Sequence, residues 1–177
     1  MSQLISQRIR VVLASLTALA LLVRPVAADV LVVDLEGGGD FVDLATATDA
    51  ALDGDIILIR PGDYGEIGFP AIINAKSLSI IGDVGGTTTV GMISVLNLPA
   101  GATVVLRNLT MRPNVLVTFY LATLGIDDSD GVVFVEDCTI PGLDGFNRPS
   151  FTGFDAVRVD NSAGAIFTRC TVTGGAG

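Results

Sequence analysis

A unit of eight residues recurs about every thirty residues, and this repeat restricts the possible folds more than any other feature of the chain. Its first and third positions are small or apolar, and its fifth is polar. The sixth and eighth are apolar, and the seventh carries a hydroxyl. Four segments follow the pattern: residues 73–80, 104–111, 133–140 and 165–172. The intervals between their starts are nearly equal, which indicates one structural unit per repeat.

The alternation inside each copy predicts β-strands, because successive side chains of a strand point to opposite faces. The phase of the alternation shifts by one residue at the polar fifth position, which predicts a corner between two short strands. A third strand is expected in each interval, at residues 89–96, 115–124 and 155–159. We therefore expect an all-β chain, a right-handed parallel β-helix with three strands per coil and about four coils stacked about 4.8 Å apart.

The segment before the first copy has a different pattern. Residues 30–33 read as a first strand, and residues 43–52 as a short helix with Asp43 as its N-cap. Gly54 ends this helix, and residues 55–60 form a further strand that stops at Pro61.

The segment of residues 1–28 has the layout of a secretory signal peptide. Arg8 and Arg10 precede an apolar run at residues 11–23, and cleavage is expected after Ala28. A membrane anchor is the alternative, although this run is short against the roughly 20 residues that span a bilayer. The sequence thus predicts one exported domain, residues 29–177, that is secreted to the extracellular space or cell surface, or to a periplasm. After cleavage we expect no membrane association.

Charge narrows the choice of partners. The chain has 10 basic and 19 acidic residues, and the segment 1–28 holds three arginines and no acid, so the domain that follows has a net charge of −12. Such a surface repels phosphate backbones, which disfavours nucleic-acid binding, and it attracts cations such as Ca²⁺.

The chain has no histidine, which excludes Ser-His-Asp, Cys-His and His-metal chemistry. Its two cysteines, Cys138 and Cys170, hold the same repeat position and should stack in neighbouring coils. Two buried thiols are the favoured interpretation. A disulfide, which export would permit, is the alternative.

Several motifs resemble the N-terminal part of pectin-lyase-like β-helix proteins, a family that includes pectinesterases. They are Gly39-Asp40-Phe41, the alanine-rich helix, Gly54-Asp55, Pro61-Gly62-x-Tyr64 and Leu78-x-Ile80-x-Gly82. The resemblance covers most of residues 30–175. It implies that the short helix caps the first coil, and that the protein binds or processes polysaccharide. It does not imply one activity, because the fold hosts several.

The resemblance also implies where a site would lie. Enzymes of this fold use carboxylates and an arginine on the outer face of one stack of strands. The matching candidates for substrate binding are Asp155, Arg158 and Asp160, and those for a Ca²⁺ site are Asp127, Asp128 and Asp130. The competing interpretation is that these are solvated turn residues.

The pectinesterase pattern is incomplete. Asp155 stands where that family has a glutamine, and residues 175–177 stand where the next catalytic residues would follow. Pectinesterase activity is therefore not supported, and no catalytic residue is assigned. An enzyme of this kind would be a polysaccharide lyase or a glycoside hydrolase.

Two functions are expected from these observations. The first is an exported protein that binds or processes polysaccharide, acidic polysaccharide in particular, with Ca²⁺ as a candidate cofactor. The second is a non-catalytic structural or adhesive solenoid of the cell surface, favoured by the scarcity of sugar-stacking aromatics. Residues 173–177 read as a turn into another coil, so we expect further coils after them, or a partner at the open end.

Overall fold

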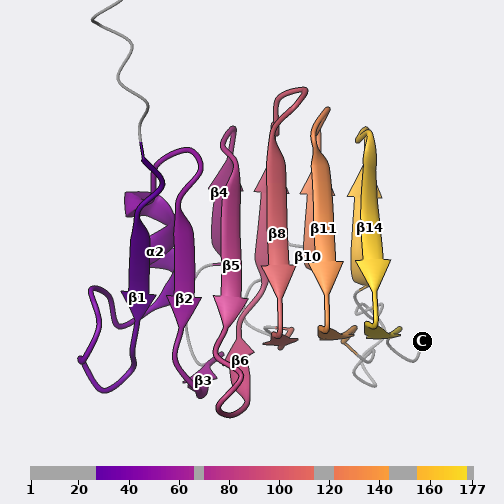
Figure 1. Cartoon of the computed structure of the whole chain (residues 1–177). Coiled ribbons are helices and arrows are strands. Elements are labelled where there is room, and N and C mark those ends of the chain that lie inside the picture. Colours follow the sequence, from indigo (N-terminus) through magenta and orange to yellow (C-terminus); the bar gives the residue numbers. More distant parts are fainter. Residues whose placement is uncertain (1–26, 66–69, 114–121, 144–154, 175–177) are drawn as a thin grey trace, which may run out of the picture.

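The computed structural model describes residues 27–65, 70–113, 122–143 and 155–174, which form a parallel β-helix of about four turns (Figure 1). The strands make three parallel sheets of six, five and four strands, called sheets A, B and C here. The fold class expected from the sequence is confirmed. Within the described ranges, no helix is both long and apolar enough to cross a membrane.

Sheet A faces the viewer in Figure 1 and runs along the whole solenoid. Its strands, in spatial order, are β1 (Val30–Val33), β2 (Ile56–Ile59), β5 (Leu78–Gly82), β8 (Thr103–Arg107), β11 (Val132–Glu136) and β14 (Gly164–Thr168). Sheet B consists of β3 (Gly62–Tyr64), β6 (Thr88–Val90), β9 (Thr110–Met111), β12 (Thr139–Pro141) and β15 (Thr171–Thr173). Sheet C consists of β4 (Ala71–Asn74), β7 (Ile93–Leu96), β10 (Ala122–Asp127) and β13 (Asp155–Asp160).

Inward-facing aliphatic side chains form one continuous core along the axis. Thr139 pairs with Thr110 on one side and with Thr171 on the other, so the residues that precede them stack as well. Those residues are Leu109, Cys138 and Cys170, and they lie one above another as the repeat requires. Leu109 and Cys138 are almost fully buried.

The corners are made by single residues in the left-handed region. At the corner from sheet A to sheet B these are Asn108, Asp137 and Arg169, with φ of 54°, 53° and 53°. They occupy the polar fifth position of the repeat, as expected. At the corner from sheet C to sheet A they are Ala75, Asn97, Asp128 and Asn161. Asparagine and aspartate tolerate this conformation better than other non-glycine residues, which explains their recurrence.

The first copy of the repeat was assigned to the wrong register. Residues 73–80 were aligned with residues 104–111, but Val104 pairs with Leu78. The bend inside residues 73–80 is the other corner, where Ala75 links sheet C to sheet A. From β2 onward each coil is longer than the one before it, so the spacing of the repeat is not constant. The register pairs that mark these coils are Ile57–Ile80, Leu78–Val104, Val104–Val133 and Val133–Ala165.

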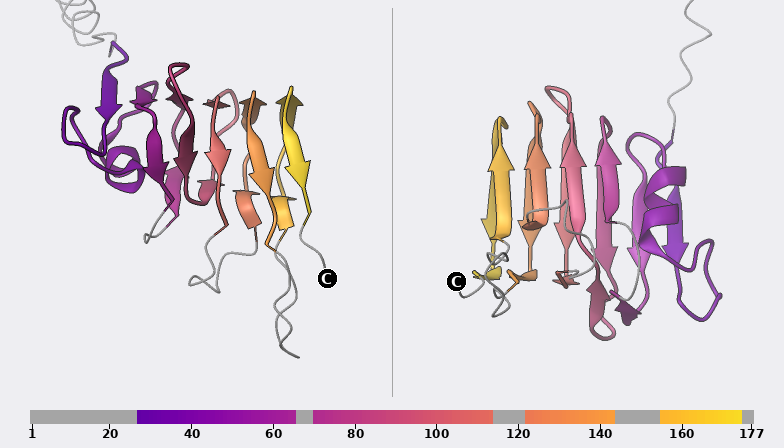
Figure 2. Two further views of the ribbon diagram at one scale, coloured as in Figure 1. Left: turned by 90° about the horizontal axis from the view of Figure 1, so that it is seen from below. Right: turned by 180° about the vertical axis from the view of Figure 1, so that it is seen from behind.

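The short helix α2 (Leu44–Ala50) lies beside β4, at the N-terminal end of sheet C (Figure 2, right). It is shorter than the expected span of residues 43–52, and Asp43 caps it as expected by accepting the backbone N–H of Thr46. The Lys76 ammonium donates to the carbonyl oxygens of Thr48 and Ala51 at the other end, both at 2.6 Å. Leu44 and Ala47 are buried, so the helix closes the first coil.

Other expectations are met in part. The strand expected at residues 89–96 is divided into β6 and β7. Of the strand expected at residues 115–124, only the last three residues lie in the described part, where they begin β10. The signal-peptide segment, apart from Ala27 and Ala28, and residues 175–177 lie outside the described residues.

Candidate functional site

Three of the six candidate residues of the sequence lie together on the outer face of sheet C. Strands β10 and β13 are neighbours, and Asp127 pairs with Asp160 while Gly125 pairs with Arg158. Leu124 and Ile126 are fully buried, so Gly125 and Asp127 point outward, as do their partners. We call Asp127, Arg158 and Asp160 the Arg158 group. Its members come from both of the sets that the sequence suggested.

The Arg158 guanidinium lies between two carboxylates. It donates to Asp160 in a very short hydrogen bond and lies 4.0 Å from the nearer carboxylate oxygen of Asp127. The bond to Asp160, with the charges of the carboxylates nearby, raises the pKa of Arg158 above its usual value. The guanidinium charge is therefore already compensated. The side chains of Asp127 and Asp160 are 32% and 55% exposed, so their carboxylates can accept hydrogen bonds from a neutral hydroxylated ligand.

Asp155 does not belong to this group. It is exposed, and it pairs with Ala122, whose side chain is buried, so it lies on the inward side of β13. Arg158 and Asp160 lie on the opposite face, three and five residues later along the strand. The charge of Asp155 nevertheless contributes to the raised pKa of Arg158, after the larger contributions of Asp160 and Asp127.

The aspartates suggested as Ca²⁺ ligands point to different places. Asp127 faces Arg158, and Asp128 accepts the side-chain N–H of Asn161 at 2.7 Å. Asp130 is exposed beyond the corner, where its backbone N–H donates to Leu98. Across the ranges that the structure describes, no three acidic, cysteine or histidine residues are grouped closely enough to hold a metal ion.

Arginine–carboxylate pairs link the coils along the surface. Arg60 pairs with Asp83, Arg107 with Glu136, Arg112 with Asp63, and Arg169 with Asp137. The Arg169 hydrogen bonds lower the pKa of Asp137. A backbone hydrogen bond from Gly85, followed by one from Arg60, lowers the pKa of Asp83. Each pair joins residues of different coils.

Sheet B carries a row of threonines that the sequence revealed only in part. Thr89, Thr110, Thr139 and Thr171 pair in register, so their side chains form one outward line parallel to the axis. We call these residues the threonine row. In the described part of the chain, their hydroxyls have no side-chain hydrogen-bond partner. The hydroxyl at the seventh repeat position was recognised, but the wrong register placed Ser79 in the row instead of Thr89.

Both cysteines are free thiols. Each thiol donates to backbone carbonyls, Cys138 to Glu136 at 3.2 Å and Cys170 to Val135 at 3.3 Å. Burial raises the pKa of Cys138 to about 11. A buried thiol of this kind is a weak nucleophile, so Cys138 fits a packing role.

No protein-family model, curated protein or solved structure matches this chain.

Proposed function

We propose that this chain is an exported β-helix protein of the pectin-lyase-like type that binds polysaccharide. The observation that carries the proposal is the threonine row. Its hydroxyls repeat once per coil, about every 4.8 Å, along a face parallel to the solenoid axis. A polymer with regularly spaced hydroxyls can meet such a row at several points at once, and each contact adds to the affinity.

The charges favour a neutral polysaccharide over an acidic one. The whole chain has a net charge of −9, and the Arg158 guanidinium is already held by two carboxylates. A polyuronate would be repelled unless a cation bridged it to the protein. The Arg158 group is a second candidate contact, since its carboxylates can accept sugar hydroxyls.

The pectin-lyase-like assignment rests on the motifs of the first coils. Pro61-Gly62-x-Tyr64 ends the strand β2 and continues into β3, and the Tyr64 hydroxyl accepts the backbone N–H of Leu35 at 3.2 Å. Asp40 accepts the backbone N–H of Val32 at 2.8 Å, which ties the Gly39-Asp40-Phe41 motif to β1. These motifs therefore have structural roles in the first coil, which supports a resemblance in fold rather than in activity.

Affinity electrophoresis through gels that contain neutral glucan, xylan or pectate tests the proposal. We expect retardation by a neutral polymer, with weaker retardation by pectate that increases when Ca²⁺ is added. The double variant Thr110→Val, Thr139→Val keeps the shape of the row and removes two hydroxyls, so it should lose most of the retardation. Thr87→Val, at an exposed position in the turn between β5 and β6, is the matched control. Equal retardation of both variants by every polymer would contradict the role of the row.

The second candidate is a non-catalytic structural or adhesive solenoid at the cell surface. The arginine–carboxylate pairs between coils favour it, because a network of ion pairs along the surface stiffens a rod without creating a site. It would be preferred if the protein bound no polymer in any gel and still attached to the surface of the cells that secrete it.

A further inference from the structure

Asp55 is a buried carboxylate with no cation beside it. It lies between the helix α2 and the strand β2 and is 3% exposed. One of its carboxylate oxygens accepts the backbone N–H of Asp29 at 2.9 Å, and the other accepts that of Leu52 at 2.7 Å. In the described part of the chain, no ion pair of lysine or arginine includes Asp55. Burial of a carboxylate without a positive charge nearby costs free energy, which its hydrogen bonds offset only in part.

The cations of the described residues are engaged elsewhere. Each arginine among them pairs with another carboxylate. The Lys76 ammonium donates to the carbonyl oxygens of Thr48 and Ala51. Residues 29–55, which surround Asp55 in the sequence, contain eight acids and neither lysine nor arginine. A positive charge beside Asp55 would therefore come from a group other than these side chains.

The atom that faces Asp55 is the nitrogen of the peptide bond between Ala28 and Asp29. This is the bond at which the sequence pattern places signal-peptide cleavage. Ala27 and Ala28 are exposed and lie outside helices and strands, since β1 begins at Val30. The bond is therefore accessible to a peptidase, while its nitrogen lies 2.9 Å from a buried carboxylate oxygen.

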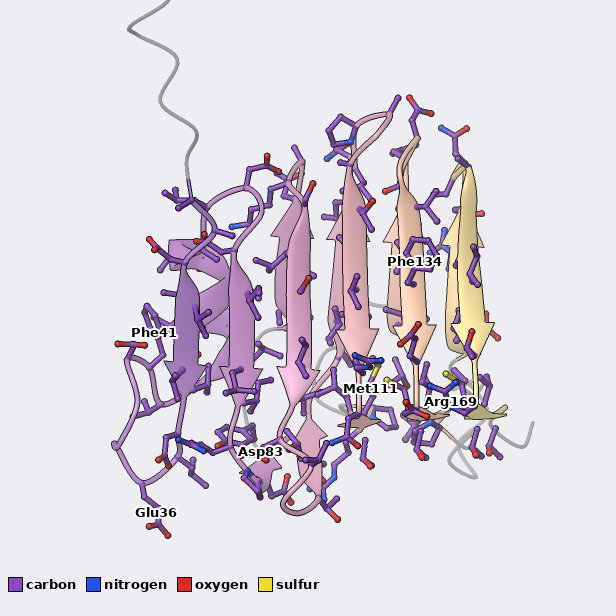
Figure 3. All side chains as sticks on the ribbon, viewed as in Figure 1. Glu36, Phe41, Asp83, Met111, Phe134 and Arg169 are labelled. Atoms are coloured by element: carbon purple, nitrogen blue, oxygen red, sulfur yellow. The ribbon has the colours of Figure 1, made fainter. Side chains whose placement is uncertain are left out.

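The strand β1 holds Asp29 in place. The Asp29 carbonyl oxygen accepts the backbone N–H of the first residue of β2 at 2.9 Å, which continues the pairing of β1 with β2. Along the other edge of β1, the backbone N–H groups of Asp40 and Phe41 donate to the Val32 carbonyl oxygen, and Figure 3 shows Phe41 beside this strand. Because both edges of β1 are occupied, we expect the Asp29 nitrogen to stay beside the carboxylate when the preceding residues are removed.

We propose that cleavage after Ala28 creates an ion pair between the new α-ammonium group of Asp29 and the buried carboxylate of Asp55, and that this pair stabilises the first coil. The inference rests on the export that is part of the proposed function. In the cleavage, the C–N bond breaks and the oxygen of a water molecule completes the carboxylate of Ala28. Both hydrogen atoms of the water end on the nitrogen, which becomes an ammonium group. An α-amino group is largely protonated at neutral pH, because its ordinary pKa is about 7.7–8.0.

The expected gain follows from the change of charge at the nitrogen. Before cleavage a neutral N–H faces Asp55, and after cleavage an ammonium group does. Asp55 is already buried before cleavage, so its desolvation adds no further cost. The gain should lie between that of an exposed ion pair and that of a buried one, since Asp29 itself is exposed. We expect the folding equilibrium constant to rise about tenfold.

A thermodynamic cycle tests the ion pair. Residues 29–177 contain every described strand, and they are prepared with a free amine on Asp29 and with that amine acetylated, so that a neutral amide replaces the ammonium group. Each form is made with Asp55 and with Asp55→Asn, and urea unfolding at about pH 6.5 gives four equilibrium constants. We expect acetylation to lower the constant about tenfold with Asp55 and less than about twofold with Asp55→Asn. Equal effects of acetylation in both backgrounds would overturn the proposal.

Asp53→Asn is the matched control. Asp53 is exposed and accepts the backbone N–H of Ser77 at 2.7 Å, so the variant makes the same chemical change at another acceptor of a backbone N–H. Acetylation should still cost about tenfold in this variant. A reduced cost equal to that in Asp55→Asn would mean that the ammonium group responds to the general negative charge of residues 29–55, and it would overturn the specific pair.

A chain that begins at Ala27 tests the pair without any change at Asp55. Its free amine is two residues farther along the chain, and the Asp29 nitrogen is again an amide. Its stability should match that of the acetylated chain, about tenfold below that of the chain that begins at Asp29. Equal stability of the chains that begin at Ala27 and at Asp29 would overturn the proposal, even if Asp55→Asn failed to fold.

N-terminal sequencing separates this inference from the proposed export. The full chain is expressed in a secreting host, and the protein recovered outside the cells should begin at Asp29. A chain retained in the cells with Met1 in place would contradict the export and the ion pair together. Export with cleavage at another bond would overturn the ion pair alone, as would a chain that begins at Asp29 and shows no dependence on Asp55.

Discussion

The stacked core makes a prediction about one position in two neighbouring coils. Ile140 and Val172 are register partners in sheet B and point toward the axis. Ile140 is fully buried between Met111 and Val172, whereas Val172 is 48% exposed at the open end. The same truncation to alanine should therefore have very different costs at the two sites.

The magnitudes follow from the carbon atoms removed. Ile140→Ala removes three buried carbons, worth about 2.4 kcal/mol at about 0.8 kcal/mol each. The cavity left between two coils adds to this, so we expect a loss of about 3–4 kcal/mol, within the range for buried isoleucine. Val172→Ala removes two carbons that are half exposed in the monomer, so about 0.8 kcal/mol is expected.

Urea unfolding measures both losses, at protein concentrations low enough that any association is negligible. The midpoint should shift strongly for Ile140→Ala and slightly for Val172→Ala, with unchanged slopes. Equal losses at the two positions would refute the reasoning, because they would mean that the last coil is as well covered as the one before it. A loss below about 1 kcal/mol at Ile140 would deny that this position is in the core.

Three further predictions concern the corners, the acid limb of stability and the buried thiol. Ala75 has a φ of 54°, so Ala75→Gly should stabilise the fold by about 0.5–1 kcal/mol in the same assay, and a loss would deny strain at that corner. The hydrogen bond from the Gly85 backbone, and then the one from Arg60, lowers the pKa of Asp83 in the folded protein. The Asp83 carboxylate therefore contributes to stability above its unfolded pKa of 3.8, and this contribution is lost as the pH falls through the lower folded pKa. Asp83→Asn should therefore flatten the acid side of a stability-against-pH curve, and an unchanged curve would exclude this role. Burial raises the pKa of Cys138 from 9.0 to about 11, so its contribution is complete below pH 9 and is lost as the pH rises through 11. Iodoacetamide at pH 8 should alkylate Cys138 only in urea, as mass spectrometry of its peptide would reveal, and rapid alkylation of the folded protein would contradict its burial.

The architecture could be predicted because its signal is repeated. The alternation of inward and outward residues repeats in each coil. A polar residue that tolerates a left-handed backbone recurs at the corners. Three copies agree in register with the structure, from Val104 to Ala165. Repetition thus compensates for the weakness of each single strand signal.

The register of the earlier coils could not be predicted, for a physical reason. Both kinds of corner have a single residue with a left-handed backbone between short apolar strands. The sequence pattern around Ala75 therefore resembles the pattern around Asn108, although the two corners join different sheets. The second coil also turns through Gly82, where an added Cβ would lie 2.2 Å from the Asn108 carbonyl oxygen. That close approach requires glycine at the position where the later coils have a polar residue. The polar fifth residue of the repeat, on which the alignment of the coils depended, is therefore missing from this coil.

The sequence predicted which side chains of β13 point outward at the candidate site. It did not predict which residue of the neighbouring strand lies beside them. Arg158 and Asp160 were placed together because they are two residues apart on one strand. The proximity of Asp127 to Arg158 depends on pairing between β10 and β13, across residues 144–154 that contain no repeat signal. Long-range register of this kind is set by the packing of whole coils rather than by local sequence.

Disulfide trapping tests the central claim of in-register coils most directly, in a background with Cys138→Ser and Cys170→Ser. The structure pairs Thr110 with Thr139 in adjacent coils, about 4.8 Å apart, and sets Thr110 and Thr171 two coils apart, about 10 Å. The variant Thr110→Cys, Thr139→Cys should form an intramolecular disulfide under mild oxidation, and Thr110→Cys, Thr171→Cys should not, because disulfides need α-carbons within about 7 Å. The intact mass of the monomer reports the bond. Cross-linking of the second pair in preference to the first would contradict the stacking of the coils.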